Sequence, residues 1–105
     1  MKKPRSEAED AARWVQRCIA NALISHSLPV SFRMDLHLSQ LAKGDRSAWE
    51  CRKHGPFFRV LVPGTKRILG LSGSAVGAWK DAEAKARRRI IDIAASVYHW
   101  KHMVD

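Results

Sequence analysis

The fold is decided by residues 74–104, which read SAVGAWKDAEAKARRRIIDIAASVYHWKHMV. Apolar side chains recur here at spacings of three and four, which at about 100° per residue places them on one side of a helix. They are Trp79, Ala82, Ala86, Ile90, Ile93, Val97, Trp100 and Val104. The spacing therefore predicts one long amphipathic helix over residues 74–104, with this stripe buried against a sheet.

A second, weaker apolar stripe lies more than a quarter-turn away on the same expected helix. It contains Ala84, Ile91, Ala95 and Tyr98. Two apolar sides require two neighbours, so we expect the sheet on one side and the N-terminal helix or a second copy of the chain on the other. Ile91 and Tyr98 are expected to make that second contact.

Basic residues border the main stripe of this helix. Helical geometry places Lys80 and Arg87 on one flank and Arg89 on the other. Arg88 faces away from the stripe. We expect this basic rim to face a negatively charged partner.

Three short segments with strand character precede the long helix, at residues 48–53, 57–62 and 67–71. The tripeptides His54-Gly55-Pro56 and Pro63-Gly64-Thr65 separate them, and both have the composition of hairpin turns. The spacing predicts three antiparallel strands.

The first 40 residues divide into a helix and a further strand. Ser6 and Glu9 form a capping box ahead of an apolar face, which predicts a helix that ends before Pro29. Between residues 30 and 38, apolar and polar side chains alternate, which is typical of a half-buried strand. The alternating apolar residues are Phe32, Met34, Leu36 and Leu38.

These elements predict an α+β fold of two layers. Its parts are an N-terminal helix, a three- to four-stranded antiparallel sheet and a long C-terminal helix, with the helices on one face of the sheet. We expect residues 1–105 to form a single domain, with residues 1–5 as a flexible basic arm.

Composition and charge limit the class of partner. The chain has 19 Lys and Arg against 10 Asp and Glu, a formal net charge of +9, which favours binding of polyanions. No apolar run is long enough to span a membrane and no signal peptide opens the chain, so we expect a cytoplasmic protein that binds no membrane. Cys18 and Cys51 are expected to be buried and unpaired.

The strongest functional signal is a run without acidic residues, from Cys51 to Lys80. Its basic residues are Arg52, Lys53, Arg59, Lys66, Arg67 and Lys80. Arginine and lysine on a strand face or a turn neutralise phosphates, and an apolar side chain such as Phe57 can contact bases. With Arg87 and Arg88 of the helix, these residues form the candidate nucleic-acid-binding site. The alternative is that they are ordinary solvated cations.

The sequence gives little support for a separate phosphate site, a metal site or a catalytic site. The segment from Gly70 to Ser74 is a candidate phosphate site, although a plain helix cap by Ser72 or Ser74 is favoured over it. His99 and His102 have no third metal ligand nearby, and no catalytic pairing of side chains stands out. We therefore expect no metal, no cofactor and no enzymatic activity.

Residues 48–95 resemble two families of nucleic-acid-binding domains. The order of three strands and a helix, with Gly70-Leu71 ending the last strand, resembles AP2-type and phage-integrase arm-binding DNA domains. That resemblance implies that the outer sheet face enters the major groove, a role that would fall on Arg52, Arg59 and Arg67.

The same residues, preceded by a helix, also resemble a double-stranded RNA-binding domain. Here Gly55-Pro56 and the segment from Phe58 to Val62 carry the resemblance. Residues 79–83 read WKDAE instead of that family's Lys-Lys-x-Ala-Lys, and a strand at residues 30–38 is foreign to it.

The expected function is that of a small basic protein that binds nucleic acid, with duplex DNA ahead of duplex RNA. Proteins of this build are common in phages and mobile elements. The competing expectation is a phage-type inhibitor that occupies an acidic protein surface or a nucleic-acid-processing complex. A homodimer is compatible with either expectation.

Overall fold

A computed structural model describes residues 6–25 and 30–100 of the chain. Three helices and three strands follow one another in the order ααβββα. They are α1 (Glu7–Ser25), α2 (Val30–Ala42), β1 (Glu50–His54), β2 (Phe57–Leu61), β3 (Ile68–Ser72) and α3 (Ala75–Ser96). The predicted α+β class, with a helix first and a long helix last, is confirmed.

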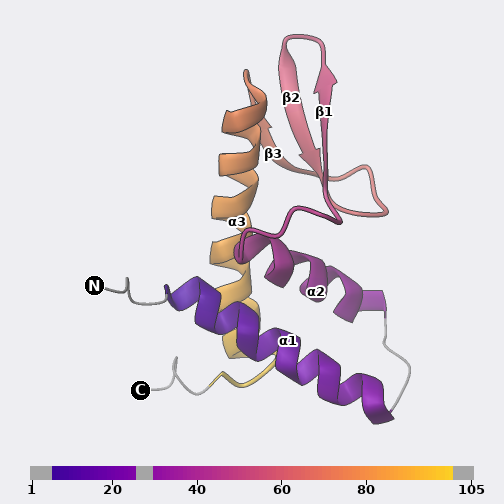
Figure 1. Cartoon of the computed structure of the whole chain (residues 1–105), viewed down its shortest axis with the longest axis vertical. Helices are drawn as coiled ribbons and strands as arrows, with labels where there is room; N and C mark the ends of the chain where they lie inside the picture. The colour runs from indigo at the N-terminus through magenta and orange to yellow at the C-terminus, as the bar shows by residue number, and fades with distance from the viewer. Residues whose placement is uncertain (1–5, 26–29, 101–105) are drawn as a thin grey trace.

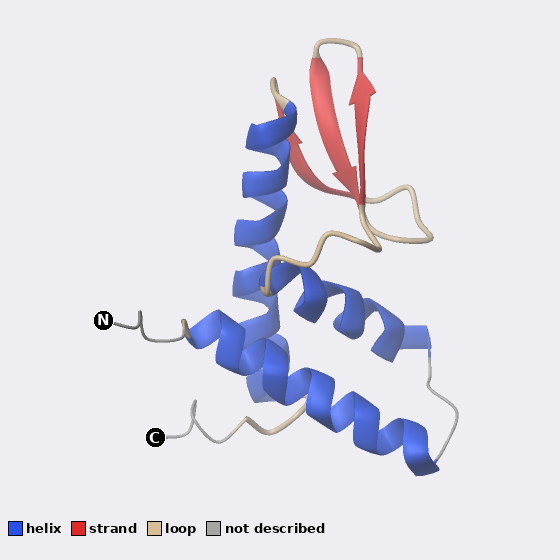
Figure 2. Ribbon diagram, viewed as in Figure 1, coloured by secondary structure: helices blue, strands red, loops and turns tan. Residues whose placement is uncertain are grey.

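Helix α3 connects the two halves of the molecule. The first half of α3 lies against the sheet, and α1 and α2 cross its second half (Figure 1). The sheet has the order β1-β2-β3 with both pairs antiparallel, and no helix lies on the side away from α3 (Figure 2). One face of the sheet is therefore uncovered.

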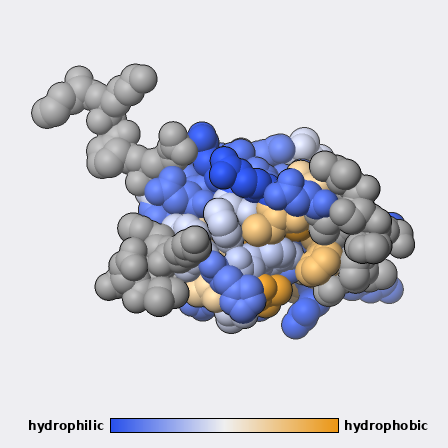
Figure 3. Space-filling view, turned by 90° about the horizontal axis from the view of Figure 1, so that it is seen from below, coloured by the Kyte–Doolittle hydropathy of each residue, from blue (hydrophilic) through white to orange (hydrophobic). Residues whose placement is uncertain are grey.

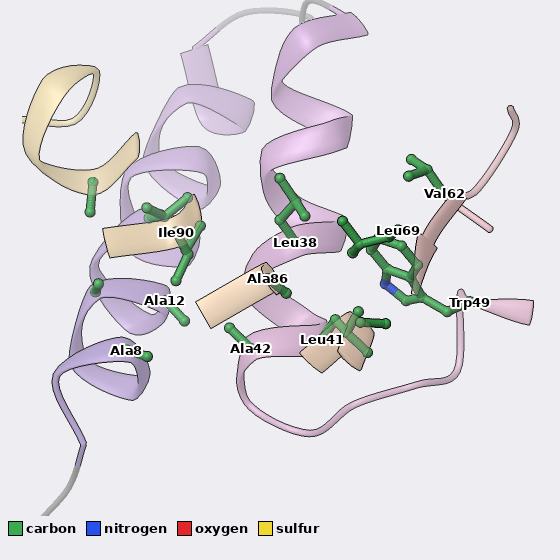
Figure 4. Packing of buried hydrophobic residues seen from close by; sticks show 14 of the residues in the cluster. Ala8, Ala12, Leu38, Leu41, Ala42, Trp49, Val62, Leu69, Ala86 and Ile90 are labelled. Atoms are coloured by element: carbon green, nitrogen blue, oxygen red, sulfur yellow. The ribbon is translucent and has the colours of Figure 1, made fainter. Parts of the chain in front are cut away.

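The strand predicted at residues 30–38 is wrong, because this segment forms helix α2. The alternation of apolar residues ends at Leu38, whereas Leu38, Leu41 and Ala42 follow helical spacing and are all buried. Figure 4 shows Ala42 near Ala86 of α3, and Leu38 and Leu41 on the side of α2 where Leu69 and Trp49 lie. Trp49 joins this packing, since its indole Nε1 donates to the carbonyl of His37 at 3.0 Å. The sheet accordingly has three strands.

The N-terminal helix starts where the sequence predicts. Ser6 Oγ accepts a hydrogen bond of 3.2 Å from the backbone amide of Glu9, as a helix cap does. Buried α1 residues include Ala8, Ala12 and Val15, and Figure 4 shows Ala8 and Ala12 close to Ile90 of α3. Viewed from the end of the molecule where α1 lies, apolar surface gathers between hydrophilic flanks (Figure 3).

Small residues let α3 approach the sheet closely. A Cβ atom built on Gly70 of β3 would lie 2.7 Å from the Cβ of Ala82 and closer still to the carbonyl oxygen of Ala78. Ala78, Ala82 and Ala86 are fully buried. Glycine at position 70 is therefore required by the contact between strand and helix.

A β-bulge in β3 decides which of its side chains face outward. Val60 pairs with Gly70 but Leu61 pairs with Ile68, so Leu69 is an extra residue between the two pairs. Leu69 and Gly70 both face α3 and are buried, whereas Ile68 and Leu71 are exposed. Simple alternation, which places Leu69 and Leu71 on one face, is wrong here.

Helix α3 ends at Ser96, not at residue 104 as the periodicity predicts. His99 has a φ of 52°, and the amide of Trp100 donates to the carbonyl of Ala94 at 2.9 Å. This turn folds Trp100 back into the core, while Val97 is 52% exposed. Both belonged to the predicted helical stripe; Val104, its last member, lies outside the described residues.

The second neighbour of α3 is the helix pair α1 and α2. The carbonyl of Tyr98 accepts a hydrogen bond of 2.8 Å from the indole Nε1 of Trp14 in α1. The hydroxyl of Tyr98 donates to Asp35 in α2, also at 2.8 Å. Ile91 is half-buried against the same core, whereas Ala84 of the second stripe is exposed. The contact expected with α1 thus forms within the chain, and α2 shares it.

The two cysteines are unpaired, as predicted. Cys18 and Cys51 are both half-buried and not fully buried. Partial burial raises the pKa of the Cys18 thiol, an effect that the nearby Arg17 opposes.

Candidate functional site

The uncovered side of the sheet, called here the outer sheet face, carries Arg52 and Arg59 of the predicted site. Cys51, Val60 and Gly70 form a register row that points toward α3, so the neighbouring rows point outward. The outer sheet face consists of Glu50, Arg52, His54, Phe57, Arg59, Leu61, Ile68 and Leu71. It combines two arginines with several large apolar side chains.

Arg52 and Arg59 are direct register partners on β1 and β2. Like charges directly opposite each other on antiparallel strands destabilise the pair. Arg52 is relieved by Glu50, whose carboxylate lies 3.0 Å away and whose hydrogen bond raises the pKa of Arg52. Among the described residues no carboxylate pairs with Arg59, and its Nε is buried without a hydrogen-bond partner. The middle of this face is therefore short of negative charge.

Large apolar side chains surround the two arginines. Phe57 is 49% exposed, Ile68 46% and Leu71 48%, and Leu71 is the register partner of Arg59. All three lie on the outer sheet face because of the strand pairing and the bulge. An exposed apolar cluster around two cations, of which only Arg52 has an acidic partner, is characteristic of a binding surface.

A groove of about 580 Å³ continues the outer sheet face at one end. Its lining includes Glu50, Arg52 and Leu61 of the sheet and the turn at residues 62–66. This turn is of type II, since Pro63 and Gly64 occupy its centre, Gly64 has a φ of 74° and the amide of Thr65 donates to the carbonyl of Val62 at 3.1 Å. The turn presents Lys66 at the rim of the groove.

The remaining strand and turn cations lie at the two ends of the sheet. Lys53 is exposed beside the hairpin turn Gly55-Pro56, in which Gly55 has the positive φ of 60° that a two-residue turn needs. Lys66 and Arg67 are exposed in the turn at the opposite end. Lys53 pairs with Phe58, two positions from the inward pair of Cys51 and Val60, so its side chain leaves the sheet on the α3 side. Lys66 and Arg67 lie beyond the opposite end of the outer sheet face.

The helix cations predicted for the same site lie elsewhere. Lys80, Arg87 and Arg88 are exposed on α3, on the side away from Ala78 and Ala82, which pack under β3. The outer sheet face and this side of α3 belong to opposite layers of the fold. The structure thus divides the predicted set into two surfaces.

The segment before α3 is a helix cap. Ser74 has an extended backbone, and its Oγ accepts a hydrogen bond of 3.0 Å from the amide of Gly77. A Cβ built on Gly77 would clash with the side chain of Ser72, so the turn and the first helical turn are closely packed. The cap favoured by the sequence is confirmed.

Sequence reasoning missed an ionic cluster that positions α3 beside the loop after α2. Arg46 donates two hydrogen bonds to Glu83, at 2.6 and 3.2 Å, and its guanidinium lies 4.8 Å from the ring centroid of Trp79. Glu83 is 9% exposed and also lies 3.6 Å from Arg87. Neither spacing nor composition links Arg46 to Glu83, because 37 residues separate them.

Comparison with protein-family models, curated proteins and solved structures found no match to this chain. Among residues 6–25 and 30–100, no helix is long and apolar enough to cross a membrane. The same residues contain no group of three or more His, Cys, Asp or Glu side chains that could hold a metal ion.

Proposed function

We propose that the protein binds duplex nucleic acid, foremost DNA, through the outer sheet face. The observation that supports the proposal is that Arg52 and Arg59 lie opposite each other on neighbouring strands. The exposed apolar side chains of Phe57 and Leu71 lie beside them. A polyanion removes the repulsion between the two guanidinium groups, and the apolar side chains supply contacts to base edges. The AP2-type resemblance implies the same surface and the same role.

The dimensions of the sheet favour DNA over RNA. The outer strands of a three-stranded sheet lie about 10 Å apart, which is comparable to the B-DNA major groove of about 12 Å. The major groove of duplex RNA is deep and narrow, so side chains on a sheet do not reach its base edges. In DNA, Lys66 and Arg67 at one end of the sheet would contact the phosphates that border the groove.

Duplex RNA is the second candidate for a specific reason. Residues 30–38 form part of a helix, so the chain from α2 to α3 has the order helix, three strands, helix. The fold therefore lacks the predicted strand at residues 30–38, which was the extra element not found in double-stranded RNA-binding domains. The missing lysines at residues 79–83 still weigh against RNA.

The proposal is tested by salt-dependent binding of Arg52→Ala/Arg59→Ala. The matched control is Arg13→Ala/Arg17→Ala, which removes the same charge from two exposed positions of α1. Each lost phosphate contact lowers the slope of log K against log salt by about 0.9, so the sheet variant should flatten the slope by about two units. The control should leave the slope unchanged.

The same titrations with duplex DNA, duplex RNA and single strands identify the ligand. Equal slopes for the wild type and the sheet variant would contradict the proposed surface. Absence of binding to every nucleic acid at low salt would reject the function and favour a protein partner, for which Phe57, Ile68 and Leu71 would serve as apolar anchors.

A further inference from the structure

Helix α3 carries a second basic surface, called here the α3 ridge. It consists of Lys80, Ala84, Arg87 and Arg88, which follow the spacing i, i+4, i+7, i+8 and are all exposed. From Lys80 to Arg88 the ridge extends over about 12 Å of helix axis, at about 1.5 Å per residue. It is long enough to contact several phosphates.

The acidic residues of this part of α3 do not neutralise the ridge. Asp81 is turned toward the sheet edge, where Oδ2 accepts hydrogen bonds of 3.0 Å from the amide of Leu71 and from Lys85. These contacts, led by the Leu71 amide, lower the pKa of Asp81 and keep it ionised. Glu83 lies on the opposite flank, bound to Arg46. Both carboxylates are therefore already bound to partners on the two flanks of the helix.

One of the three ridge cations has a partial partner. Arg87 lies 3.6 Å from Glu83, but Glu83 makes its shorter contact of 2.6 Å with Arg46. No ion pair involves Lys80 or Arg88 within residues 6–25 and 30–100. Arg88 interacts with Asp81 only at longer range, through its charge. The ridge keeps a net positive charge that an external anion can neutralise.

The α3 ridge and the outer sheet face point in opposite directions. Ala78 and Ala82 face β3, so the ridge, about half a helical turn away, faces out of the helical layer. The Arg52 and Arg59 side chains face out of the sheet layer. A straight duplex that lies on one layer cannot touch the other, because the complete thickness of the domain separates them.

We propose that the α3 ridge is a second binding site for a duplex phosphate backbone, so that one protein molecule links two duplex segments. This inference rests on the proposed function, which supplies the first duplex through the outer sheet face. The ridge has cations and a small alanine but no large apolar side chain, so its contact is electrostatic and independent of base sequence. An acidic protein seated on the ridge is the outcome that the test separates from this one.

The test is a two-duplex capture experiment. The protein is loaded on an immobilised DNA duplex, unbound protein is washed away, and capture of a second, fluorescent duplex is measured per molecule loaded. The variant is Lys80→Ala/Arg87→Ala/Arg88→Ala. The control is Arg13→Ala/Arg17→Ala/Arg33→Ala, which removes the same charge from three exposed positions of α1 and α2. Circular dichroism confirms that both variants are folded.

The wild type and the control should capture the second duplex, whereas the ridge variant should load normally and capture at least about tenfold less. Wild-type protein that loads but captures no second duplex would overturn the inference, leave the proposed function intact and favour an acidic protein as the partner of the ridge. Wild-type protein that does not load would reject the proposed function itself. Undiminished capture by the ridge variant would also overturn the inference, because self-association would then explain the bridging.

Discussion

The backbone amide of Leu71 donates a 3.0 Å hydrogen bond to the Oδ2 of Asp81. Leu71 lies on the edge strand β3 and Asp81 on α3, so a helix side chain occupies a donor that the sheet leaves unpaired. Edge strands with free donors recruit other strands, and this contact occupies one such donor on the edge of β3. The same carboxylate pairs with Lys85, which holds it on the flank of α3.

Replacing Asp81 with asparagine should make the stability less dependent on pH. The folded-state pKa of Asp81 is lowered, so its contribution is present above the unfolded pKa of about 3.9 and is lost as the pH falls through the folded value. Asp81→Asn should therefore melt below the wild type at pH 7, and the gap should narrow at pH 3. Thermal melts at the two pH values check this; a constant gap would contradict it.

Gly70→Ala should destabilise the protein by about 1–3 kcal/mol, the typical cost of overpacking. The new methyl group would collide with the Ala78 carbonyl and with Ala82, both of which belong to a buried helix face. Gly73→Ala is the matched control, since a Cβ atom there meets nothing within 4 Å. Urea titrations measure both variants. Equal stabilities of the two variants would show that β3 and α3 are less closely packed.

The single tyrosine of the chain should resist ionisation in the native state. Burial, followed by the hydrogen bond to Asp35, raises the pKa of Tyr98 well above its usual value. Its contribution to stability is complete below the unfolded pKa of about 10 and is lost as the pH rises through the folded value. The phenolate absorbance should thus appear near pH 10 in guanidinium and only at higher pH, or on unfolding, in the native protein.

Phe57→Ala/Leu71→Ala should weaken DNA binding without changing its salt dependence. Both side chains are about half exposed on the outer sheet face, and neither contacts a phosphate through charge. The affinity should fall by at least about tenfold, since complete burial of a Phe or Leu side chain contributes about 1.5–3 kcal/mol. Val76→Ala, at a side chain 65% exposed in the first turn of α3, is the control. An unchanged affinity would leave phosphate contact as the only mode of binding.

Local signals in the sequence were sufficient to predict most of the helices and strands. Ser6 and Ser74 cap their helices through their own hydroxyl groups, and Gly55 and Gly64 take the positive φ values that their turns need. Each of these features depends on neighbours within a few residues, which a sequence displays directly. The strand that bears Arg59 was also predictable, because aromatic and β-branched residues occupy most of residues 57–62 and a turn lies on each side.

The tertiary structure decided what the local pattern left open. Residues 30–38 alternate like a strand, yet they form a helix because Leu38, Leu41 and Ala42 are buried where α2 packs on α3. The bulge at Leu69 turns Leu71 outward, which depends on how β3 pairs with Val60 and on the close contact of Gly70 with α3. No local pattern encodes either contact.

The sequence determines the net charge of the protein, but it does not show where in space the charged side chains lie. The sequence alone established a net charge of +9 and a run of basic residues without acids. The division of those residues into the outer sheet face and the α3 ridge required the packing of α3 on the sheet. Arg59 and Arg87 are 28 positions apart in the printed sequence, and only the layered fold places them on opposite sides of the domain. The physical reason is that a buried face of the helix and a buried face of the sheet must meet, which turns the remaining face of each toward solvent.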